Sequence, residues 1–186
     1  RRPPRSTLFP YTTLFRSVRL LRGYASTGVS PADTPDGLEE LAALVGNSSA
    51  VKQEIVGRDP LEKGERRVLN LGHTWAHAIE WWQQSHPGQN TAYTHGEAVA
   101  IGIIAAARKA GELGLVTQEG LADTLAADFA SCGLPTMLPC GEEQLLEAIR
   151  RDKKAAGAAP GEEQTVAVVL PVRIGKVVIK QLPIRL

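Results

Sequence analysis

The chain has 186 residues, of which 43% are hydrophobic and 22% charged, and its formal net charge is +1. These values are typical of a globular protein with one domain or slightly more, and they exclude a strongly basic nucleic-acid-binding surface. No uncharged apolar stretch reaches about 18 residues, so we predict neither a transmembrane helix nor a membrane partner. The two cysteines, Cys132 and Cys140, are predicted to be free thiols in a reducing cytoplasm.

The N-terminal segment needs separate treatment. Residues 7–17, TLFPYTTLFRS, resemble the in-frame translation of a sequencing-library adapter. Pro10 interrupts the apolar run and no small-residue cleavage site follows, so a signal peptide is not predicted. We therefore expect residues 1–17 to be an artefact without a structural role, and residues 18–186 to form the folded domain.

Apolar periodicity, capping residues and Gly or Pro positions together predict the elements of this domain. Helices are predicted over residues 37–45, 50–56, 65–84, 97–113, 118–131 and 142–154. Loops are predicted over residues 18–36 and 85–94, and Thr117 is the predicted cap of the helix over 118–131. Val- and Ile-rich runs at residues 165–170 and 176–181 predict a β-hairpin. The expected fold class is mainly α, a multi-helix domain with a small C-terminal β-hairpin.

Five polar residues follow helical spacing in the segment predicted as one long helix. They are Arg66, Asn70, His73, His77 and Glu80, and on an ideal helix they fall within an arc of roughly 80°. Two histidines four residues apart form a common metal-binding geometry, although such histidines as often only cap a helix or bond to neighbours. Thr74 follows His73 where a zinc protease of the His-Glu-x-x-His type has its glutamate, so protease chemistry is disfavoured.

A third histidine, His95, precedes the next strongly apolar helix and is followed by Gly96. One histidine from each of two helices plus a carboxylate would make a catalytic-type metal site with an open coordination position. The alternative is that His95 only bonds to the backbone at the start of that helix. His86, in the polar loop, is predicted to be solvated.

Three further residues supply what a phosphorylated or carboxylated substrate needs: a point charge from Lys52, a planar fork from Arg66 and an amide from Asn70. Each alone is typical of a surface, and their grouping with the histidines is what favours a pocket. Lys153 adds a cation to this set or belongs to a solvated charge cluster. No Gly-rich dinucleotide fingerprint and no Walker loop is present, so no NAD or ATP motif is recognised.

Several motifs resemble one family. The segments are KQEIVGRDPLEKGERRVLNLGHTWAHAIE from Lys52, HGEAVAIG from His95, GLPTMLP, DKK, and VVLPVRIGKVVI. Together they resemble the C-terminal domain of 3-dehydroquinate synthase and its sugar-phosphate cyclase relatives over residues 51–179.

The resemblance implies a cytoplasmic, homodimeric lyase that depends on NAD and on Zn²⁺ or Co²⁺. Its reaction would convert 3-deoxy-arabino-heptulosonate 7-phosphate to 3-dehydroquinate with elimination of phosphate, a step of the shikimate pathway of aromatic amino acid biosynthesis. A metal there would polarise the substrate's hydroxyl and carbonyl oxygens.

By position, the resemblance implies that His73 and His95 are the metal ligands and that His77 is a substrate-side catalytic residue. Catalytic roles are also implied for Lys52 and Arg66. The implied substrate-binding set is Lys52, Arg66, Asn70, His77 and Lys153.

The sequence departs from the family pattern at several places. The family's third metal ligand is a glutamate in Gly-x-Ala-Glu-x-x-Lys, whereas here Ala25 is followed by Ser26. Ala76 replaces the glycine that usually precedes His77. We expect the NAD-binding N-terminal domain to be missing, with no cofactor-binding residue in this chain, so that the chain alone is inactive.

Two alternatives remain open at this point. One is another sugar-phosphate cyclase, such as a cyclitol synthase. The other is a non-catalytic helical module that binds zinc or phosphate.

Overall fold

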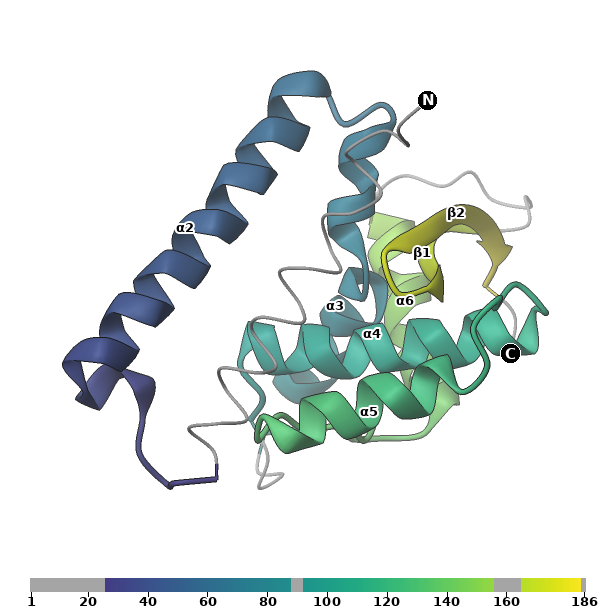
Figure 1. Ribbon diagram of the computed structural model, residues 1–186. Coiled ribbons are helices and arrows are strands. Elements are labelled where there is room, and N and C mark those ends of the chain that lie inside the picture. The colour runs from purple at the N-terminus through teal and green to yellow at the C-terminus, as the bar shows by residue number, and fades with distance from the viewer. Residues whose placement is uncertain (1–25, 88–91, 156–164, 185–186) are drawn as a thin grey trace.

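The computed structural model describes residues 26–87, 92–155 and 165–184. Its elements are η2 (Pro31–Asp33), α2 (Pro35–Arg58), η3 (Glu65–Asn70), α3 (His73–Ser85), α4 (His95–Glu112), α5 (Leu121–Ser131), α6 (Glu142–Ala155), β1 (Thr165–Arg173) and β2 (Lys176–Pro183). Helix α4 is central, because α3, α5 and the β1–β2 hairpin pack against it, and α6 packs on α3 (Figure 1). The expected fold class, mainly α with a small C-terminal hairpin, is confirmed.

Helix α2 is one continuous helix, so the predicted break at residues 46–49 is wrong. Its start is well determined, since Pro35 occupies the first turn and the Thr34 hydroxyl accepts the Gly37 N–H at 3.1 Å. Gly46 and Asn47 each cost at most about 1 kcal/mol of helix propensity, and the hydrogen-bonded turns on both sides outweigh that cost.

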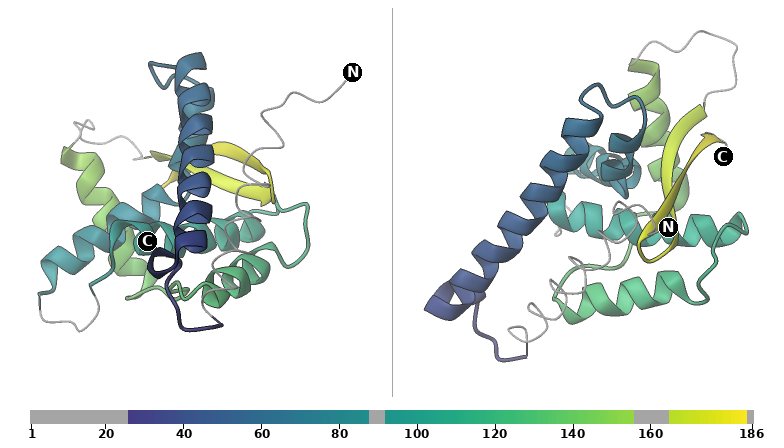
Figure 2. Two further views of the ribbon diagram at one scale, coloured as in Figure 1. Left: turned by 60° about the vertical axis from the view of Figure 1, so that its left-hand side comes forward. Right: turned by 45° about the horizontal axis from the view of Figure 1, so that its top comes forward.

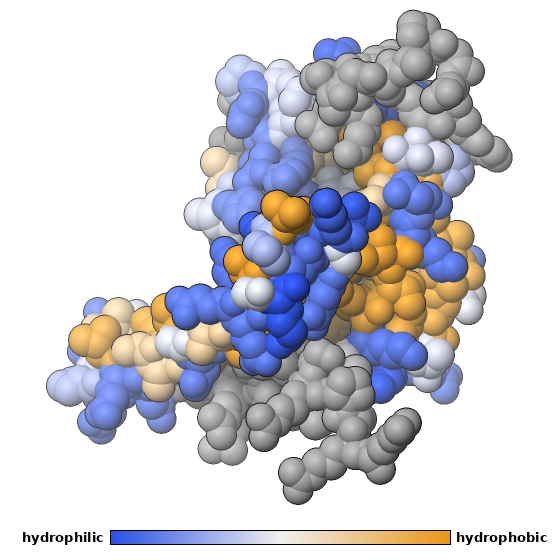
Figure 3. Space-filling model, turned by 90° about the horizontal axis from the view of Figure 1, so that it is seen from above, coloured by the Kyte–Doolittle hydropathy of each residue, from blue (hydrophilic) through white to orange (hydrophobic). Residues whose placement is uncertain are grey.

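Helix α2 extends away from the other helices as an arm (Figures 1 and 2). Its main contacts are with η2 and η3, and within it only Gly37 and Ile55 are buried. Leu38 and Val45 are 54% and 58% exposed, and the arm at the left of Figure 3 shows hydrophobic residues beside hydrophilic ones. The described chain therefore leaves part of the apolar surface of α2 uncovered.

The long helix predicted over residues 65–84 is also wrong. The chain forms the 3₁₀ helix η3, stops at Leu71 and Gly72, and starts α3 at His73. Gly72 has φ +82°, a conformation that glycine adopts at no steric cost and other residues rarely adopt. Arg66 and Asn70 therefore do not continue the α3 face that carries His73 and His77.

A close backbone contact between α3 and α4 explains the break. A Cβ built on Gly72 would lie 2.8 Å from the carbonyl oxygen of Val99, and one built on Gly102 would collide with the carbonyl oxygen of Gly72. Ala76, which replaces the glycine of the family pattern, is accommodated there with no exposed surface, opposite Gly102. Two glycines thus let the start of α3 lie directly on α4.

The core is built from small residues and a few large aliphatic ones. The buried face of α4 is largely alanine, and it packs against Ile79 of α3 and Leu145 of α6 on one side. Leu121 and Phe129 of α5 pack on another side. The small side chains of α4 therefore allow close packing on several of its faces.

The C-terminal hairpin is confirmed, with β1 and β2 antiparallel and Gly175 at φ +79° in the turn. The prediction that Thr117 caps α5 is wrong, because α5 begins after Gly120. The backbone N–H of Thr117 instead donates to the Val172 carbonyl at 2.8 Å, and its hydroxyl donates to the same oxygen. Thr117 therefore fastens the α4–α5 connection to the hairpin.

Several predictions concern residues outside the described ranges. They include the adapter-like segment 7–17 and the Gly23–Ala25 position of the family's glutamate motif. Within residues 26–87, 92–155 and 165–184, no helix has the length and apolarity needed to span a bilayer.

Replacing Gly102 tests the close contact. Gly102→Ala is expected to lower the free energy of unfolding by about 1–3 kcal/mol, because its methyl group meets backbone that cannot yield. The matched control is Gly111→Ala in the same helix, where a Cβ meets nothing within 4 Å. That substitution should stabilise by about 0.5–1 kcal/mol. Urea denaturation measures both, and equal effects would contradict the contact.

Candidate functional site at the α3–α4 junction

Three imidazoles converge where α3 and α4 begin. The ring centres of His73 and His95 are 5.4 Å apart, those of His73 and His77 are 5.8 Å apart, and those of His77 and His95 are 6.3 Å apart. The structure thus brings together the two predicted metal ligands and the predicted substrate-side histidine. His95 is 18 residues or more from the other two in the sequence.

The local sequence fixes where each helix begins. His73 is the first residue of α3, directly after Gly72, and His77 lies one turn later on the same face. His95 is the first residue of α4, whose start is fixed by a capping box. In that box the Thr94 hydroxyl accepts the Glu97 N–H while the Glu97 carboxylate accepts the Thr94 N–H at 2.8 Å. The Thr-x-x-Glu pattern was visible in the sequence and could have placed this helix start two residues earlier.

Each presumed ligand has its Nδ1 atom engaged. His95 Nδ1 lies 2.8 Å from Glu80 Oε1, and His73 Nδ1 lies 3.3 Å from the Leu71 carbonyl oxygen. The alternative in which His95 bonds to the backbone is not what the structure has, because its partner is a carboxylate from the other helix. Nδ1 is thus the ring nitrogen whose partner the structure shows in both histidines.

Burial lowers the pKa of His73, and the nearby imidazoles of His95 and His77 lower it further. The hydrogen bond to the Leu71 carbonyl opposes this shift. His73 is therefore a neutral imidazole at neutral pH, the form that carries a lone pair for a metal.

A cavity of about 440 Å³ opens beside the histidines. Its lining includes Asn70, His73, His77, Trp81 and Arg151. The guanidinium of Arg151 lies 5.1 Å above the Trp81 ring and pairs with Glu147 at 2.7 Å. Sequence analysis missed Arg151. The sequence signal for it was its spacing of four residues from Glu147, which favours an ion pair on a helix.

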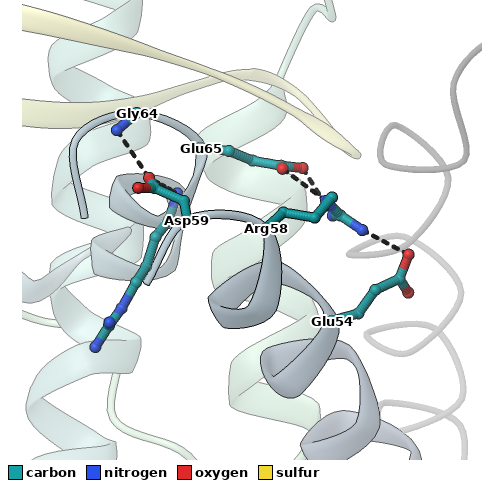
Figure 4. Close-up of polar contacts among 6 residues, drawn as sticks. Glu54, Arg58, Asp59, Gly64 and Glu65 are labelled. Atoms are coloured by element: carbon teal, nitrogen blue, oxygen red, sulfur yellow. Dashed lines mark hydrogen bonds and ion pairs between the residues drawn. The ribbon is translucent and has the colours of Figure 1, made fainter. Parts of the chain in front are cut away.

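The loop before η3 is organised by one carboxylate. Asp59 accepts backbone N–H groups from Lys63 at 3.0 Å, Gly64 at 2.8 Å and Arg66 at 3.0 Å. These bonds, that of Arg66 first, hold the pKa of Asp59 below its usual range. Next to it, Arg58 bonds Glu65 through two nitrogens and also reaches Glu54 (Figure 4). The loop is thereby fixed to the end of α2.

Glu62 joins two of the predicted substrate residues. Its carboxylate accepts the Asn70 amide N–H at 2.6 Å and lies 3.7 Å from Arg66 Nε. The Arg66 guanidinium also donates to the Pro60 carbonyl at 2.9 Å. Sequence analysis missed Glu62, although its spacing of four to Arg66 and eight to Asn70 offered a signal.

Other predicted residues lie elsewhere. Lys52 is exposed on the α2 arm and does not line the cavity. Lys153 belongs to α6, but its side chain lies outside the described residues. His86, predicted to be solvated, stacks on Trp82 with ring centres 5.0 Å apart and bonds the Trp82 carbonyl at 2.9 Å.

The described residues contain no group of three or more His, Cys, Asp or Glu side chains arranged to hold a metal ion. The metal prediction therefore concerns the pair His73 and His95. Two imidazoles on one zinc ion, with Zn–N of about 2.0–2.1 Å, have ring centres roughly 5 Å apart. The 5.4 Å between these rings is close to that spacing.

Solved structures share this fold. A 2-deoxy-scyllo-inosose synthase complexed with carbaglucose-6-phosphate, NAD+ and Co2+ matches with a TM-score of 0.62 and 21% identity, over 94% of this chain and 50% of that chain. ValA, a 2-epi-5-epi-valiolone synthase from Streptomyces hygroscopicus subsp. jinggangensis 5008 with NAD+ and Zn2+ bound, matches with a TM-score of 0.60 and 21% identity, over 94% and 45%. At this identity the likeness establishes the fold.

The sequence establishes the family. The model of the 3-dehydroquinate synthase C-terminal family matches residues 29–155, and the chain belongs to that family. The 3-dehydroquinate synthase of Xylella fastidiosa strain M23 is 53% identical over 117 residues, which are 61% of this chain and 31% of that protein. That of Xanthomonas campestris pv. campestris strain 8004 is 46% identical over 116 residues, again 61% and 31%. The matched segment thus spans under a third of these relatives.

Asp59 gives a pH-dependent test of the loop that carries Arg66. Because folding lowers the pKa of Asp59 below the unfolded value of about 3.9, its stabilisation is present above that pH and is lost as pH falls through the folded pKa. We expect Asp59→Asn to be less stable than the parent at pH 7, with the difference shrinking as the pH falls below the unfolded pKa and then through the lower folded pKa of Asp59. Urea midpoints across this pH range measure this, with Glu119→Gln, an exposed carboxylate, as control. A difference that is constant with pH would contradict the role of the charge.

Proposed function

We propose that this chain is the metal- and substrate-binding part of a 3-dehydroquinate synthase. The proposed reaction is the conversion of 3-deoxy-arabino-heptulosonate 7-phosphate to 3-dehydroquinate with loss of phosphate, in the cytoplasm. The observation that carries the proposal is that the rings of His73 and His95 lie 5.4 Å apart, beside a cavity that His73, His77 and Asn70 line. Family membership and the relatives' names support it.

His73 and His95 would hold a divalent metal, Zn²⁺ or Co²⁺. The donor set fits, because zinc binds imidazole nitrogens and its histidine ligands commonly have a carboxylate as hydrogen-bond partner, as His95 has here in Glu80. When bound, the metal would supply Lewis-acid polarisation of substrate oxygens. The fold neighbours named above were solved with NAD+ and with Co2+ or Zn2+, which supports both cofactors in the full-length protein.

The remaining residues would bind and orient the substrate. His77 would donate a hydrogen bond to a substrate oxygen, since its exposed ring lies beside the metal pair and faces the cavity. Asn70 would present its amide to the same space, with the Glu62 carboxylate fixing its orientation at 2.6 Å. Arg66, held by Glu62 and Pro60, would supply a planar fork for a phosphate or carboxylate group.

Lys52 would join this set only when α2 is covered by the rest of a full-length protein. On α2, Leu38, Val45 and Lys52 recur every seven residues and so share one face. The exposure of Leu38 and Val45 supports a further domain packing on that face. We propose that this domain is the NAD-binding domain and that Lys153 adds a second cation; a homodimer is proposed for the complete enzyme.

Another sugar-phosphate cyclase activity is the second candidate, and the likeness to two cyclitol-forming synthases favours it. The full-length protein should release phosphate from 3-deoxy-arabino-heptulosonate 7-phosphate when NAD and Zn²⁺ are present. Its kcat/KM for a hexose 6-phosphate should be at least about 100-fold lower, a difference of about 2.7 kcal/mol. A higher kcat/KM for the hexose 6-phosphate would contradict the 3-dehydroquinate synthase assignment and support another sugar-phosphate cyclase.

Metal uptake by the chain itself tests the ligand pair. Calorimetric titration with Zn²⁺ should show binding to the parent chain and none to His73→Ala or His95→Ala, because each substitution removes one of two imidazoles. His86→Ala, which removes an imidazole stacked on Trp82 at the far end of α3, is the matched control and should bind as the parent does. Zinc binding that survives both ligand substitutions would overturn the assignment.

A further inference from the structure

We propose that Glu80 is the positioning residue of His95: its carboxylate accepts the Nδ1–H proton and thereby leaves Nε2 as the nitrogen available to the metal. This inference rests on the proposed function, because it concerns the same metal pair. Of the three polar residues on one face of α3, His73 is a proposed metal ligand and His77 a proposed substrate-binding residue. The inference gives a role to the third, Glu80.

The contact joins two helices. Glu80 Oε1 lies 2.8 Å from His95 Nδ1, across 15 residues of sequence. The side chain of Glu80 is 29% exposed and that of His95 is 55% exposed, so the carboxylate is the more enclosed partner. His73, His77 and Glu80 follow one another at spacings of four and three, so α3 presents two imidazoles and this carboxylate in one row.

The hydrogen bond decides which nitrogen is free. A neutral imidazole has one N–H and one lone pair, so a carboxylate on Nδ1 places the proton there and the lone pair on Nε2. His73 shows the same arrangement with a backbone carbonyl, since its Nδ1 faces the Leu71 oxygen. A second partner of this kind is the usual support of metal-binding histidines, because it fixes the tautomer and the ring orientation and raises ligand basicity.

A structural role at the helix start does not account for Glu80. The capping box of Thr94 and Glu97 already satisfies the first turn of α4. Glu80 contacts instead the side chain of the first helical residue. The contact therefore constrains the imidazole itself, which is what a metal ligand needs.

Zinc affinity and tautomer state test the inference in the full chain. Glu80→Gln and Glu80→Ala should raise the Kd for Zn²⁺ by about 10-fold to 100-fold, with the larger loss for alanine. Glu112→Gln removes an exposed carboxylate that pairs with Lys109 at the other end of α4, and it should change Kd less than twofold. Unchanged affinity in Glu80→Ala would overturn the proposal. Loss as complete as in His73→Ala would also overturn it, because Glu80 would then be a ligand itself.

A second readout needs no metal. Two-bond ¹H–¹⁵N NMR spectra of the metal-free parent should show His95 in the Nδ1–H tautomer, with a shift toward Nε2–H in Glu80→Ala and none in Glu112→Gln. The Nε2–H tautomer in the parent would sink the proposal. Failure of the parent to bind zinc would count against the metal assignment, while the tautomer still decides what Glu80 does to His95.

Discussion

The backbone contact between Gly72 and Gly102 is the constraint on which the rest of the site depends. Because neither residue has a side chain, the start of α3 lies directly on α4. The same contact ends the preceding 3₁₀ helix and makes His73 the first residue of α3. A helix that continued unbroken through Gly72 would have required a wider separation and different ring positions. The spacing of the two proposed metal ligands thus depends on how closely the two backbones approach each other.

Around this contact the polar groups divide into two connected sets. Glu80 and the Leu71 carbonyl hold the imidazoles of His95 and His73, the two proposed metal ligands. Glu62 holds Asn70 and Arg66, two of the proposed substrate-binding residues. In each set a carboxylate orients a group of different chemistry, and His77 lies between the two sets. Asn70, His73 and His77 line the cavity beside them.

The α2 arm has its hydrogen bonds, but only part of its packing, within the described residues. Both ends of the helix are hydrogen-bonded to neighbouring residues, the first turn through Thr34 and the last through Asp59. Its packing is incomplete, because Leu38, Val45 and Lys52 remain exposed on it. The matched curated relatives are much longer than the segment that they share with this chain. The NAD-binding domain proposed above would cover this exposed face of α2.

The sequence by itself determined the fold class, the C-terminal hairpin and the choice of His73, His77 and His95 as candidate site residues. These follow from local periodicity and from motif residues at fixed spacing. The sequence misplaced two helix breaks. It predicted a break in α2 at Gly46, where the helical hydrogen bonds continue in spite of the low helix propensity. It also predicted one helix over residues 65–84, which is interrupted where Gly72 packs on α4. Only the tertiary structure placed Glu80 on His95, since the two residues lie on different helices. Such pairs depend on the distance between separate elements, and a one-dimensional spacing rule carries no information about that distance.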